Sequence, residues 1–403
     1  MKKMIIISPN FTEQRFRERW IRFSEKYIDY DIYLFSPDKR KIGYQKEYSF
    51  GKVRLDSGEI FNTERCHGIV FKINYHRFIS WTSENIVRKI QQIQPDIVYY
   101  IGLHNQESIV QIIRGIKKLK NTKLILFSMR GPQHVLRSTC EGSFVKKILK
   151  KVQYMYEKTK QSYIFDHVDA ICCHYPDAKK LFEKEGFSKP IFIQTQIGVN
   201  STVYKYNYKK CINIRKKYNI NESDFVFGCA VRFASEKGVS IILKALQKVN
   251  AKLLLMGAGN EWEENKINQE IKKMGISDKV IKTGFINGDT MVDYWNAVDC
   301  AIHVPYGVKN WVETFSLAVV QAMSVGLPVI GSNSGSIPYQ IGYEELIIPE
   351  KDSIALAEKM NWIINNPKER SRLAKLVHER TIAKFDILNL NDEMYKICES
   401  LFE

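Results

Sequence analysis

Short apolar runs and amphipathic stretches alternate along the second half of the chain. Short runs rich in Val, Ile and Leu, bounded by turn residues, are typical of buried strands. From residue 225 onward these runs are FVFGCAV, AKLLLMG, KVIKTGF, CAIHVP, PVIGS and ELIIP. The stretches between them place apolar residues at helical spacing, as in GVSIILKALQKV, EENKINQEIKKMG and TMVDYWNAV. Strands that alternate with helices in this way predict a parallel, doubly wound sheet.

The first half repeats this rhythm less regularly. Its strand-like runs are MIIIS, DIYLFS, GIVFKI, DIVYYIG, KLILFS, DAICCHY and IFIQ. Helices are expected near residues 13–27, 82–93, 106–118 and 144–160, and the tail from Pro367 to Glu403 is expected to be helical throughout.

Length and rhythm together predict more than one domain. At 403 residues the chain exceeds what a single hydrophobic core usually serves. We predict an α/β fold with two similar domains, residues 1–195 and 196–385. A C-terminal helix over 386–403 would follow, and it could pack back on the first domain.

Nothing in the sequence has the pattern of a targeting segment or a membrane span. The opening MKKMIIISPN has an apolar stretch too short for a signal peptide. No run approaches the roughly 18 to 20 consecutive apolar residues of a membrane-spanning helix. The eight cysteines show no CxxC pair, and several lie in apolar runs. We therefore expect a cytoplasmic protein whose cysteines are reduced and buried.

Positive charge is concentrated in the first half. The net charge is +17, and residues 1–200 carry 35 Lys and Arg against 20 Asp and Glu, while the remainder carries 26 against 24. This asymmetry favours contact with something anionic, such as nucleic acid, a phosphorylated substrate or a lipid surface. A Lys-rich surface that only faces solvent is the alternative.

Two cations follow the first strand of the second domain. The run FVFGCAV leads into RFASEKG, which places Arg232 and Lys237 in a loop at the carboxyl end of a strand, where ligands of open α/β sheets bind. A planar guanidinium, a compact ammonium and the amides of a helix that starts near Gly238 suit a diphosphate. Taken alone, the pair could equally be two solvated loop cations.

A glycine-rich turn, MGAGN, follows the next strand and contains Gly257 and Gly259. By itself this is weak, because glycines also serve ordinary strand-to-helix turns. The turn lacks the third glycine and the downstream acid of a dinucleotide fingerprint, which argues against a dehydrogenase.

The stretch ETFSLAVVQAMSV is predicted to form a helix that begins near Glu313 and ends before Gly326. In such a helix Glu313 and Gln321 would lie about 12 Å apart and within roughly 80° of one face. The two polar groups could then grip the two ends of a nucleotide sugar, and the amides of Phe315 and Ser316 could meet the phosphate oxygens between them.

In order along the chain, these segments resemble the nucleotide-binding half of the family 4 glycosyltransferases. The resembling segments are RFASEKG, LLLMGAGN, VIKTGFI, DYWNAVDCAIHVP, ETFSLAVVQAMSVGLPVIGSNSGSIPYQI and NNPKERSRLAKLVHERTIAKF. In the first half PDIVYYIG, HVDAICCHYPDAKKLF and IGVNSTVY resemble family segments that lead into the interdomain linker. The resemblance covers most of the chain and implies the GT-B fold, two Rossmann-like domains facing across a cleft, with retention of anomeric configuration.

The resemblance also implies roles for individual residues. Arg232 and Lys237 match the basic pair that holds the donor diphosphate and stabilises the charge that develops as it leaves. Glu313 matches the first Glu of the family's E-x7-E motif, which contacts the donor sugar. The remaining donor-binding positions are expected to be Gly257, Gly259, Gly284, Thr314, Phe315, Ser316 and Gln321.

Gln321 departs from the family pattern, because a second Glu normally stands there and binds the ribose hydroxyls. A carboxylate accepts hydrogen bonds from two hydroxyls, whereas an amide accepts one and donates the other. Losing a charge-assisted bond costs about 1 to 3 kcal/mol unless one hydroxyl turns to accept. We expect weaker donor binding rather than loss of activity.

The first domain departs from the family as well. SPNFTEQRF, which contains Asn10, replaces the family's Gly-Gly pair after the first strand, and Asn10 is a candidate acceptor contact. FSMRGPQH stands where many members show His-Gly, so Arg130 or His134 could approach the reacting sugar. Local pairing of Arg130 and a surface position for His134 are equally open.

No metal or other cofactor is expected. In this family the acceptor hydroxyl is thought to attack on the face that the diphosphate leaves, so we nominate no enzyme nucleophile and no general base. Asp29 and Asp31 form a D-x-D, the manganese motif of the other large glycosyltransferase fold. Here it precedes the second strand, where turn and strand-entry chemistry explains it better.

Residues 143–160, SFVKKILKKVQYMYEKTK, form a basic amphipathic pattern. Apolar positions recur at helical spacing at Phe144, Ile148, Val152 and Tyr156; the lysines around them are Lys146, Lys147, Lys150 and Lys151. Such a helix suits an anionic membrane surface, and a core-packed helix with a solvated basic face is the alternative. With the basic first half, the pattern favours a lipid-linked glycan or glycolipid acceptor and a position at the inner face of the membrane.

Three functions follow from these patterns. The leading hypothesis is a nucleotide-sugar-dependent, retaining hexosyltransferase of bacterial surface polysaccharide or glycolipid synthesis. A non-catalytic protein of the same fold that binds a glycan or a partner enzyme is the alternative, supported mainly by Gln321. Nucleic-acid binding rests on charge alone, because no recognition motif accompanies it, and we do not expect it.

Overall fold

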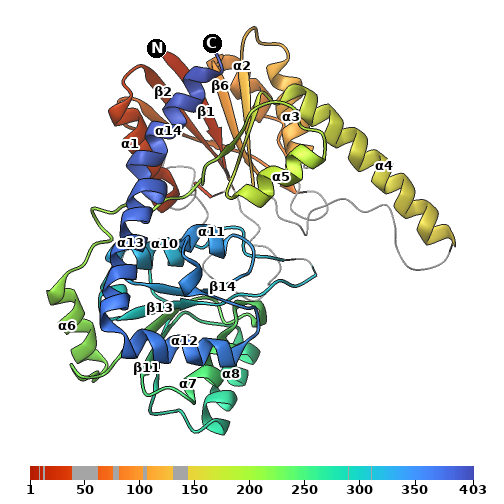
Figure 1. Cartoon of the computed structure of the whole chain (residues 1–403). Helices are drawn as coiled ribbons and strands as arrows, with labels where there is room; N and C mark the ends of the chain where they lie inside the picture. The colour runs from red at the N-terminus through yellow and green to blue at the C-terminus, as the bar shows by residue number, and fades with distance from the viewer. Residues whose placement is uncertain are drawn as a thin grey trace. The chain divides into compact units, whose positions relative to one another are not determined.

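The computed structural model describes residues 1–8, 10–11, 14–38, 62–75, 81–102, 107–129, 144–288, 290–309 and 311–403. The chain divides into two compact units (Figure 1). The first unit contains Met1–Gln196 and Asn391–Glu403, and the second contains Ile197–Leu390. The boundaries expected from the sequence were after residues 195 and 385.

The first unit is built on a parallel sheet in the order β3-β2-β1-β6-β7-β8-β9. Its strands are β1 (Lys2–Ile7), β2 (Tyr30–Pro37), β3 (Cys66–Phe71), β6 (Ile97–Gly102), β7 (Lys123–Ser128), β8 (Ala170–Cys173) and β9 (Ile191–Ile193). A short antiparallel pair, β4 (Asn74–Tyr75) and β5 (Trp81–Thr82), stands apart from this sheet. The strand order changes direction beside β1, where Ile5 pairs with Tyr33 on one side and Val98 on the other.

Helices join the strands of the first sheet in the connections that the structure describes, as parallel topology requires. They are α1 (Gln14–Lys26), α2 (Ile86–Ile93), α3 (Glu107–Ile116), α4 (Phe144–His167) and α5 (Pro176–Lys184). Helix α4 continues seven residues past the predicted end, because its last turns carry Ile164 and Phe165 into the core.

The second unit has a parallel sheet in the order β12-β11-β10-β13-β14-β15. Its strands are β10 (Val226–Ala230), β11 (Lys252–Met256), β12 (Val280–Gly284), β13 (Cys300–His303), β14 (Val329–Ser332) and β15 (Ile347–Ile348). Its helices are α6 (Tyr208–Lys217), α7 (Val239–Leu246), α8 (Glu261–Lys273), α9 (Met291–Asn296), α10 (Leu317–Val325), α11 (Ile337–Ile341), α12 (Ser353–Asn365) and α13 (Pro367–Phe385). Two single turns, η2 (Ser235–Lys237) and η3 (Glu344–Leu346), complete it.

The central strands of both sheets are buried on both faces, which explains why the sequence showed them as continuous apolar runs. Leu253, Leu254, Leu255 and Met256 are fully buried in β11, and a comparable run fills β6. The predicted α/β fold with two Rossmann-like domains is confirmed.

The C-terminal tail is two helices that are separated at Asp386. Helix α13 stops at Phe385, and Asp386 has extended backbone that pairs in parallel with Val199 before α14 (Ile387–Ser400) begins. The carboxylate of Asp386 also accepts from the Ser201 amide at 3.1 Å. These bonds replace one turn of helix, so the prediction of a helical tail throughout was wrong at this residue.

Helix α14 packs into the first unit beside α1 (Figure 1). Tyr27 and Tyr395 stack with ring centroids 4.2 Å apart, and Met394 and Cys398 are fully buried. The first unit is therefore assembled from the two ends of the chain.

Among the described helices, none is both long and apolar enough to cross a membrane. The seven cysteines of the described residues are all free thiols. Asp31, part of the D-x-D, accepts from the Tyr33 hydroxyl at 2.6 Å and lies 2.8 Å from Nε2 of His67. Its carboxylate is thus occupied within the first unit.

Candidate active site

A buried ion pair lies beyond the carboxyl end of β10. Lys237 Nζ donates to Glu313 Oε2 at 2.6 Å, and both side chains are largely buried. The single turn η2 delivers Lys237, and Gly238 follows with φ of +79°. A Cβ at Gly238 would lie 2.2 Å from the carbonyl oxygen of Val304, so glycine lets this loop pack against the end of β13.

Glu313 lies in the loop before α10 and not in the helix. Its carbonyl oxygen accepts from the Ser336 amide at 2.9 Å. In a helix starting at Glu313, that oxygen would instead accept from the amide four residues later in the chain. Ser316 caps the helix instead, because its hydroxyl accepts from the Val319 amide. The predicted helix start, and the shared helical face of Glu313 and Gln321, were therefore wrong. The predicted end before Gly326 is confirmed.

Two unpredicted side chains complete the surroundings of the ion pair. The Lys237 ammonium lies 4.3 Å from the ring centroid of Trp311, a cation–π distance. Nε2 of His303 lies 3.5 Å from Glu313 Oε2 but without hydrogen-bond geometry. Among the described residues neither ring nitrogen of His303 has a hydrogen-bond partner.

The charges of this cluster are set by competition between burial and pairing. Burial alone would raise the pKa of the Glu313 carboxyl, but Lys237 and His303 outweigh it and hold the pKa at about 2. Burial lowers the pKa of His303 against the opposing pull of Glu313. At neutral pH the cluster is thus an ammonium, a carboxylate and a neutral imidazole.

Arg232 differs from Lys237 in its surroundings. Its side chain is 52% exposed, and its nearest acid is Glu236, with Nη2 and Oε1 3.9 Å apart. An ion pair that long and exposed holds the guanidinium weakly. Both predicted cations follow β10, but one is already occupied and the other is available to solvent.

The two predicted glycine turns lie together at the ends of β11 and β12. The amide of Gly257 donates to the Gly284 carbonyl at 2.9 Å. Gly257 has φ of +134°, and a Cβ there would lie 1.9 Å from the Val231 carbonyl oxygen. The Gly259 amide donates to Glu264 Oε1 at 3.0 Å, a contact that a ligand would have to share.

The N-terminus of α10 is less open to a ligand than expected. The Ser316 amide donates to Oε1 of buried Gln340 at 2.8 Å, and Nε2 of Gln340 donates back to the Ser316 carbonyl at 3.0 Å. The aromatic ring of half-buried Phe315 packs 6.0 Å from that of Phe385. Thr314 is half-buried in the same loop. In the free protein the Ser316 amide is therefore bonded to a side chain, so the phosphate oxygen predicted to meet it would have to share or displace this bond.

Gln321 is buried one turn into α10. Its Nε2 donates to the Tyr204 hydroxyl at 2.8 Å, and that hydroxyl donates to the Gly288 carbonyl at 2.9 Å. An amide can donate to Tyr204 where a carboxylate would have to accept from it. Gln321 thus belongs to a chain of hydrogen bonds that a Glu could not make in the same direction.

The predicted residues of the first unit are only partly described. Asn10 is buried after β1, and its amide donates to the Ser8 hydroxyl at 3.2 Å. Arg130 and His134 lie outside the described residues. On α4, Lys146 and Lys151 are exposed and Lys150 is half-buried, while the side chain of Lys147 is not among those described.

Sequence reasoning missed Trp311, His303, Gln340 and Tyr204. Trp311 stands two residues before Glu313, and His303 ends an otherwise apolar strand, so both gave a local signal of a polar or aromatic group at the ligand end of the sheet. Gln340 and Tyr204 gave none, since each contact joins distant segments.

Residues 212–380 match the family described as glycosyl transferases group 1. The match lies within the second unit and spans the buried ion pair, both glycine turns and α10. Together with the two Rossmann-like units, it supports a glycosyl transferase group 1 protein of GT-B fold.

Curated relatives agree with this class. The chain is 26% identical over 379 residues to an uncharacterized glycosyltransferase of Methanocaldococcus jannaschii, MJ1059, covering 90% of this chain and 84% of that protein. It is 26% identical over 226 residues to the lipopolysaccharide 1,2-N-acetylglucosaminetransferase of Salmonella typhimurium, covering 51% of this chain and 56% of that enzyme. The chain spans only 37% to 56% of the length of several curated relatives that it matches.

A solved structure shows the same architecture over the whole chain. Anabaena Alr3699/HepE in complex with UDP-glucose superposes with a TM-score of 0.67, covering 99% of this chain and 100% of that one at 16% identity. At that identity the likeness concerns the fold.

Proposed function

We propose that this protein is a retaining, metal-independent glycosyltransferase that moves a hexosyl group from a nucleoside-diphosphate sugar to a glycan acceptor. The observation that carries the proposal is the buried Lys237–Glu313 pair at the carboxyl end of a Rossmann-like sheet, inside the segment that matches glycosyl transferases group 1. An ammonium and a carboxylate at one point suit a donor that is anionic at its diphosphate and rich in hydroxyls at its sugar.

Each residue has a distinct role in the proposed reaction. Lys237 and Arg232 bind the diphosphate and stabilise its charge as the bond from the anomeric carbon to the phosphate oxygen breaks. Glu313 accepts hydrogen bonds from the donor sugar and orients it. The acceptor hydroxyl oxygen forms the new bond to the anomeric carbon on the face that the diphosphate leaves, and the hydroxyl proton passes to a phosphate oxygen. The nucleoside diphosphate departs with that proton.

The relatives support the substrate class of the proposal. The Salmonella relative is a lipopolysaccharide N-acetylglucosaminetransferase, and the Anabaena structure holds UDP-glucose. A lipid-linked glycan or glycolipid of a bacterial surface polysaccharide is the proposed acceptor, with cytoplasmic synthesis at the inner face of the membrane.

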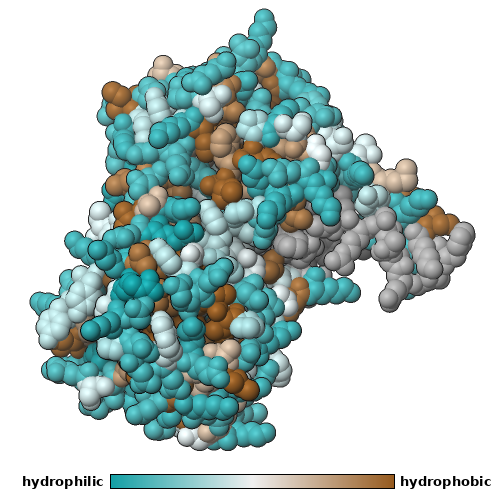
Figure 2. Space-filling view, in the orientation of Figure 1, coloured by the Kyte–Doolittle hydropathy of each residue, from teal (hydrophilic) through white to brown (hydrophobic). Residues whose placement is uncertain are grey.

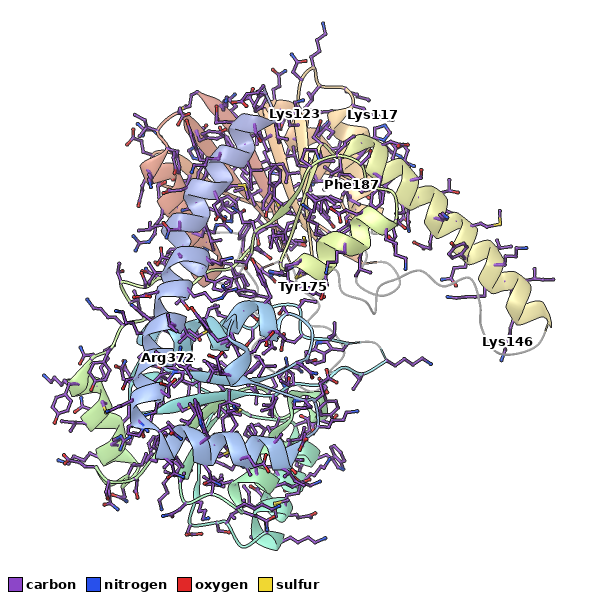
Figure 3. The ribbon with its side chains drawn as sticks, in the orientation of Figure 1. Lys117, Lys123, Lys146, Tyr175, Phe187 and Arg372 are labelled. Atoms are coloured by element: carbon purple, nitrogen blue, oxygen red, sulfur yellow. The ribbon has the colours of Figure 1, made fainter. Side chains whose placement is uncertain are left out.

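Helix α4 supports membrane attachment in this proposal. Its amino-terminal half extends beyond the other helices of the first unit (Figure 1), and Lys146 lies near its tip (Figure 3). Hydrophobic residues are exposed on this projecting half (Figure 2). The exposed apolar side chains there are Ile148, Leu149, Val152, Met155 and Tyr156. At 100° per residue they fall within about 120° of one helix face, and the lysines Lys146, Lys150 and Lys151 fall outside it. An apolar face with a basic opposite face suits an anionic lipid surface.

A thermal-shift panel tests the donor site. UDP, GDP, ADP and CDP, with and without their common sugars, are added to the wild type, to Arg232→Ala and to Lys248→Ala. Ligand at about 100 times its dissociation constant should add roughly 2.7 kcal/mol of stability. Lys248 is an exposed lysine between the end of α7 and the amino end of β11, away from the carboxyl ends where the donor is expected. Its alanine variant therefore controls for the loss of one positive charge.

One nucleotide should raise the midpoint of the wild type and of Lys248→Ala, and Arg232→Ala should lose the effect. Transfer of labelled sugar to a lipid extract then tests the reaction. Absence of any shift at millimolar concentration would reject the donor site.

The non-catalytic alternative is favoured by one observation. Gln321 already donates to Tyr204, at the position where the family's second Glu binds ribose. A protein that binds glycan but no nucleotide in the panel would support this alternative.

A further inference from the structure

If the proposed function holds, on which this inference rests, the Lys237 ammonium binds two anions in turn: the Glu313 carboxylate and the donor diphosphate. In the free protein it is bound to Glu313 at 2.6 Å, with only 14% of its side chain exposed. A diphosphate at the same loop needs the same ammonium. The ammonium has three N–H donors but one positive charge, so sharing that charge with a diphosphate would draw Lys237 at least partly away from Glu313.

Glu313 would then be a buried carboxylate without its cation. Lys237 gives the only hydrogen bond to the Glu313 carboxylate among the described residues. A buried charge stripped of its partner is strongly unfavourable, so the exchange needs a second donor close at hand.

His303 is placed to be that donor. Its Nε2 lies 3.5 Å from the same Oε2 that binds Lys237. The ring is 5% exposed, and its two nitrogens are buried without hydrogen-bond partners in the described part of the chain. A buried polar group left unpaired is costly, and such groups in native structures have a reason. A shift of a few tenths of an ångström would bring Nε2 to an ordinary hydrogen-bond distance of about 3.0 Å.

We propose that His303 is a positioning residue that takes over the Glu313 carboxylate when a diphosphate draws Lys237 away. The neutral imidazole places its one N–H on Nε2, toward Glu313, so it supplies a donor without adding a charge. Lys237 turns to the diphosphate, and Glu313 stays in place to accept from the donor sugar. Diphosphate binding and sugar orientation thereby become linked through one exchange of partners.

A double-mutant cycle with inorganic pyrophosphate tests the exchange without a base or a sugar. Dissociation constants are measured by calorimetry for the wild type, Glu313→Gln, His303→Leu and the double variant. Lys237→Met, which should lose binding, confirms that the anion occupies this site. His303→Asn retains an N–H donor and serves as the matched control.

Four results are expected. Glu313→Gln binds pyrophosphate about tenfold more tightly, because Lys237 no longer leaves a carboxylate behind. His303→Leu binds it about tenfold more weakly, and His303→Asn stays within about threefold of the wild type. In the Glu313→Gln background, His303→Leu has no further effect. Coupling between the two positions is the readout that a merely structural role would not produce.

The proposal would be overturned if His303→Leu weakened pyrophosphate binding equally in the wild-type and Glu313→Gln backgrounds. It would also be overturned if His303→Leu did not weaken binding at all. No pyrophosphate binding by the wild type would also overturn it. If His303→Leu does not fold, nitrogen-15 NMR of the wild-type imidazole replaces it: the Nε2–H signal must move on addition of pyrophosphate. A complete cycle with no binding of any nucleotide sugar would retain the role of His303 and reject the proposed transferase.

Discussion

Arg19 and Asn391 hold each other across 372 positions of sequence. Nε of Arg19 donates to Oδ1 of Asn391 at 3.1 Å, and Nδ2 of Asn391 donates to the Arg19 carbonyl at 2.9 Å. The buried guanidinium also donates to the carbonyls of Thr195 and Gln196, at 2.7 and 3.0 Å. The Arg19 side chain thus links three segments of the first unit: α1 itself, the residues at which the chain leaves the unit, and α14, with which the chain returns to it.

We expect Arg19→Met to destabilise the first unit by about 3 kcal/mol, because several buried acceptors lose their donor together. Urea unfolding measures this. Arg22→Met, one turn later, removes only an exposed pair with Glu18 and should cost less than about 1 kcal/mol. Equal losses in the two variants would mean that the Arg19 hydrogen bonds contribute little.

A hydrogen bond joins Gly257 and Gly284, yet substitution of each by alanine should change the stability by different amounts. Gly257→Ala brings a Cβ to 1.9 Å from the Val231 carbonyl oxygen, so the loop must move, and we expect a loss of about 3 kcal/mol or more. Gly284 also has positive φ, at +72°, but a Cβ there meets nothing within 4 Å. Its alanine variant should cost about 1 kcal/mol, from backbone strain alone. Thermal midpoints compare the two; a more harmful Gly284→Ala would contradict the geometry.

Glu313 should make stability depend on pH in the acid range. Its folded pKa of about 2 lies below the ordinary value of 4.5. A depressed carboxyl pKa stabilises the folded state above pH 4.5, and the contribution disappears as pH falls from 4.5 toward 2. Unfolding free energies of the wild type and Glu313→Gln should therefore converge over that interval. A difference that stays constant with pH would show that the carboxyl is not ionised in this way.

Gln321→Glu tests whether α10 contacts a ribose. The carboxylate could accept from two ribose hydroxyls, so nucleoside diphosphate should bind about tenfold more tightly. Inorganic pyrophosphate has no ribose, and its affinity should not change. An unchanged nucleoside-diphosphate affinity would separate Gln321 from the donor and leave its bond to Tyr204 as a packing feature.

The exposed apolar face of α4 should determine membrane binding. Leu149, 64% exposed, and Val152 lie on the apolar face, and changing both to Glu should reduce binding to phosphatidylglycerol vesicles at least about tenfold. Ile354→Glu alters a similarly exposed apolar residue, at 58%, on α12 of the second unit. Flotation with vesicles compares them. If Ile354→Glu weakens binding as much, α4 is not the attachment site.

The sequence predicted the sheets well because local composition suffices for them. A strand such as β11 is apolar at every interior position, since helices cover both faces of its sheet. Arg232, Lys237 and Glu313 could also be nominated from the sequence, because they lie in motifs that follow one another in a recognisable order.

Contacts between distant segments could not be read in the same way. The start of α10 depends on Ser336, which bonds the Glu313 carbonyl from a turn beyond β14. His303 ends β13, and Glu313 lies ten positions later in the loop before α10, so no helical or strand periodicity links them. The break at Asp386 required Val199, from the other end of the second unit.

The division of the first unit between the two ends of the chain bears on its synthesis. A ribosome completes the second unit as one uninterrupted segment ending at Leu390, whereas the first unit lacks Met394 and Cys398 until the residues after Leu390 emerge. The first unit, although begun before the second, is therefore completed after it. Until α14 arrives, the Tyr395 ring that stacks on Tyr27 is absent, and part of the core of the nascent amino-terminal unit is open to solvent.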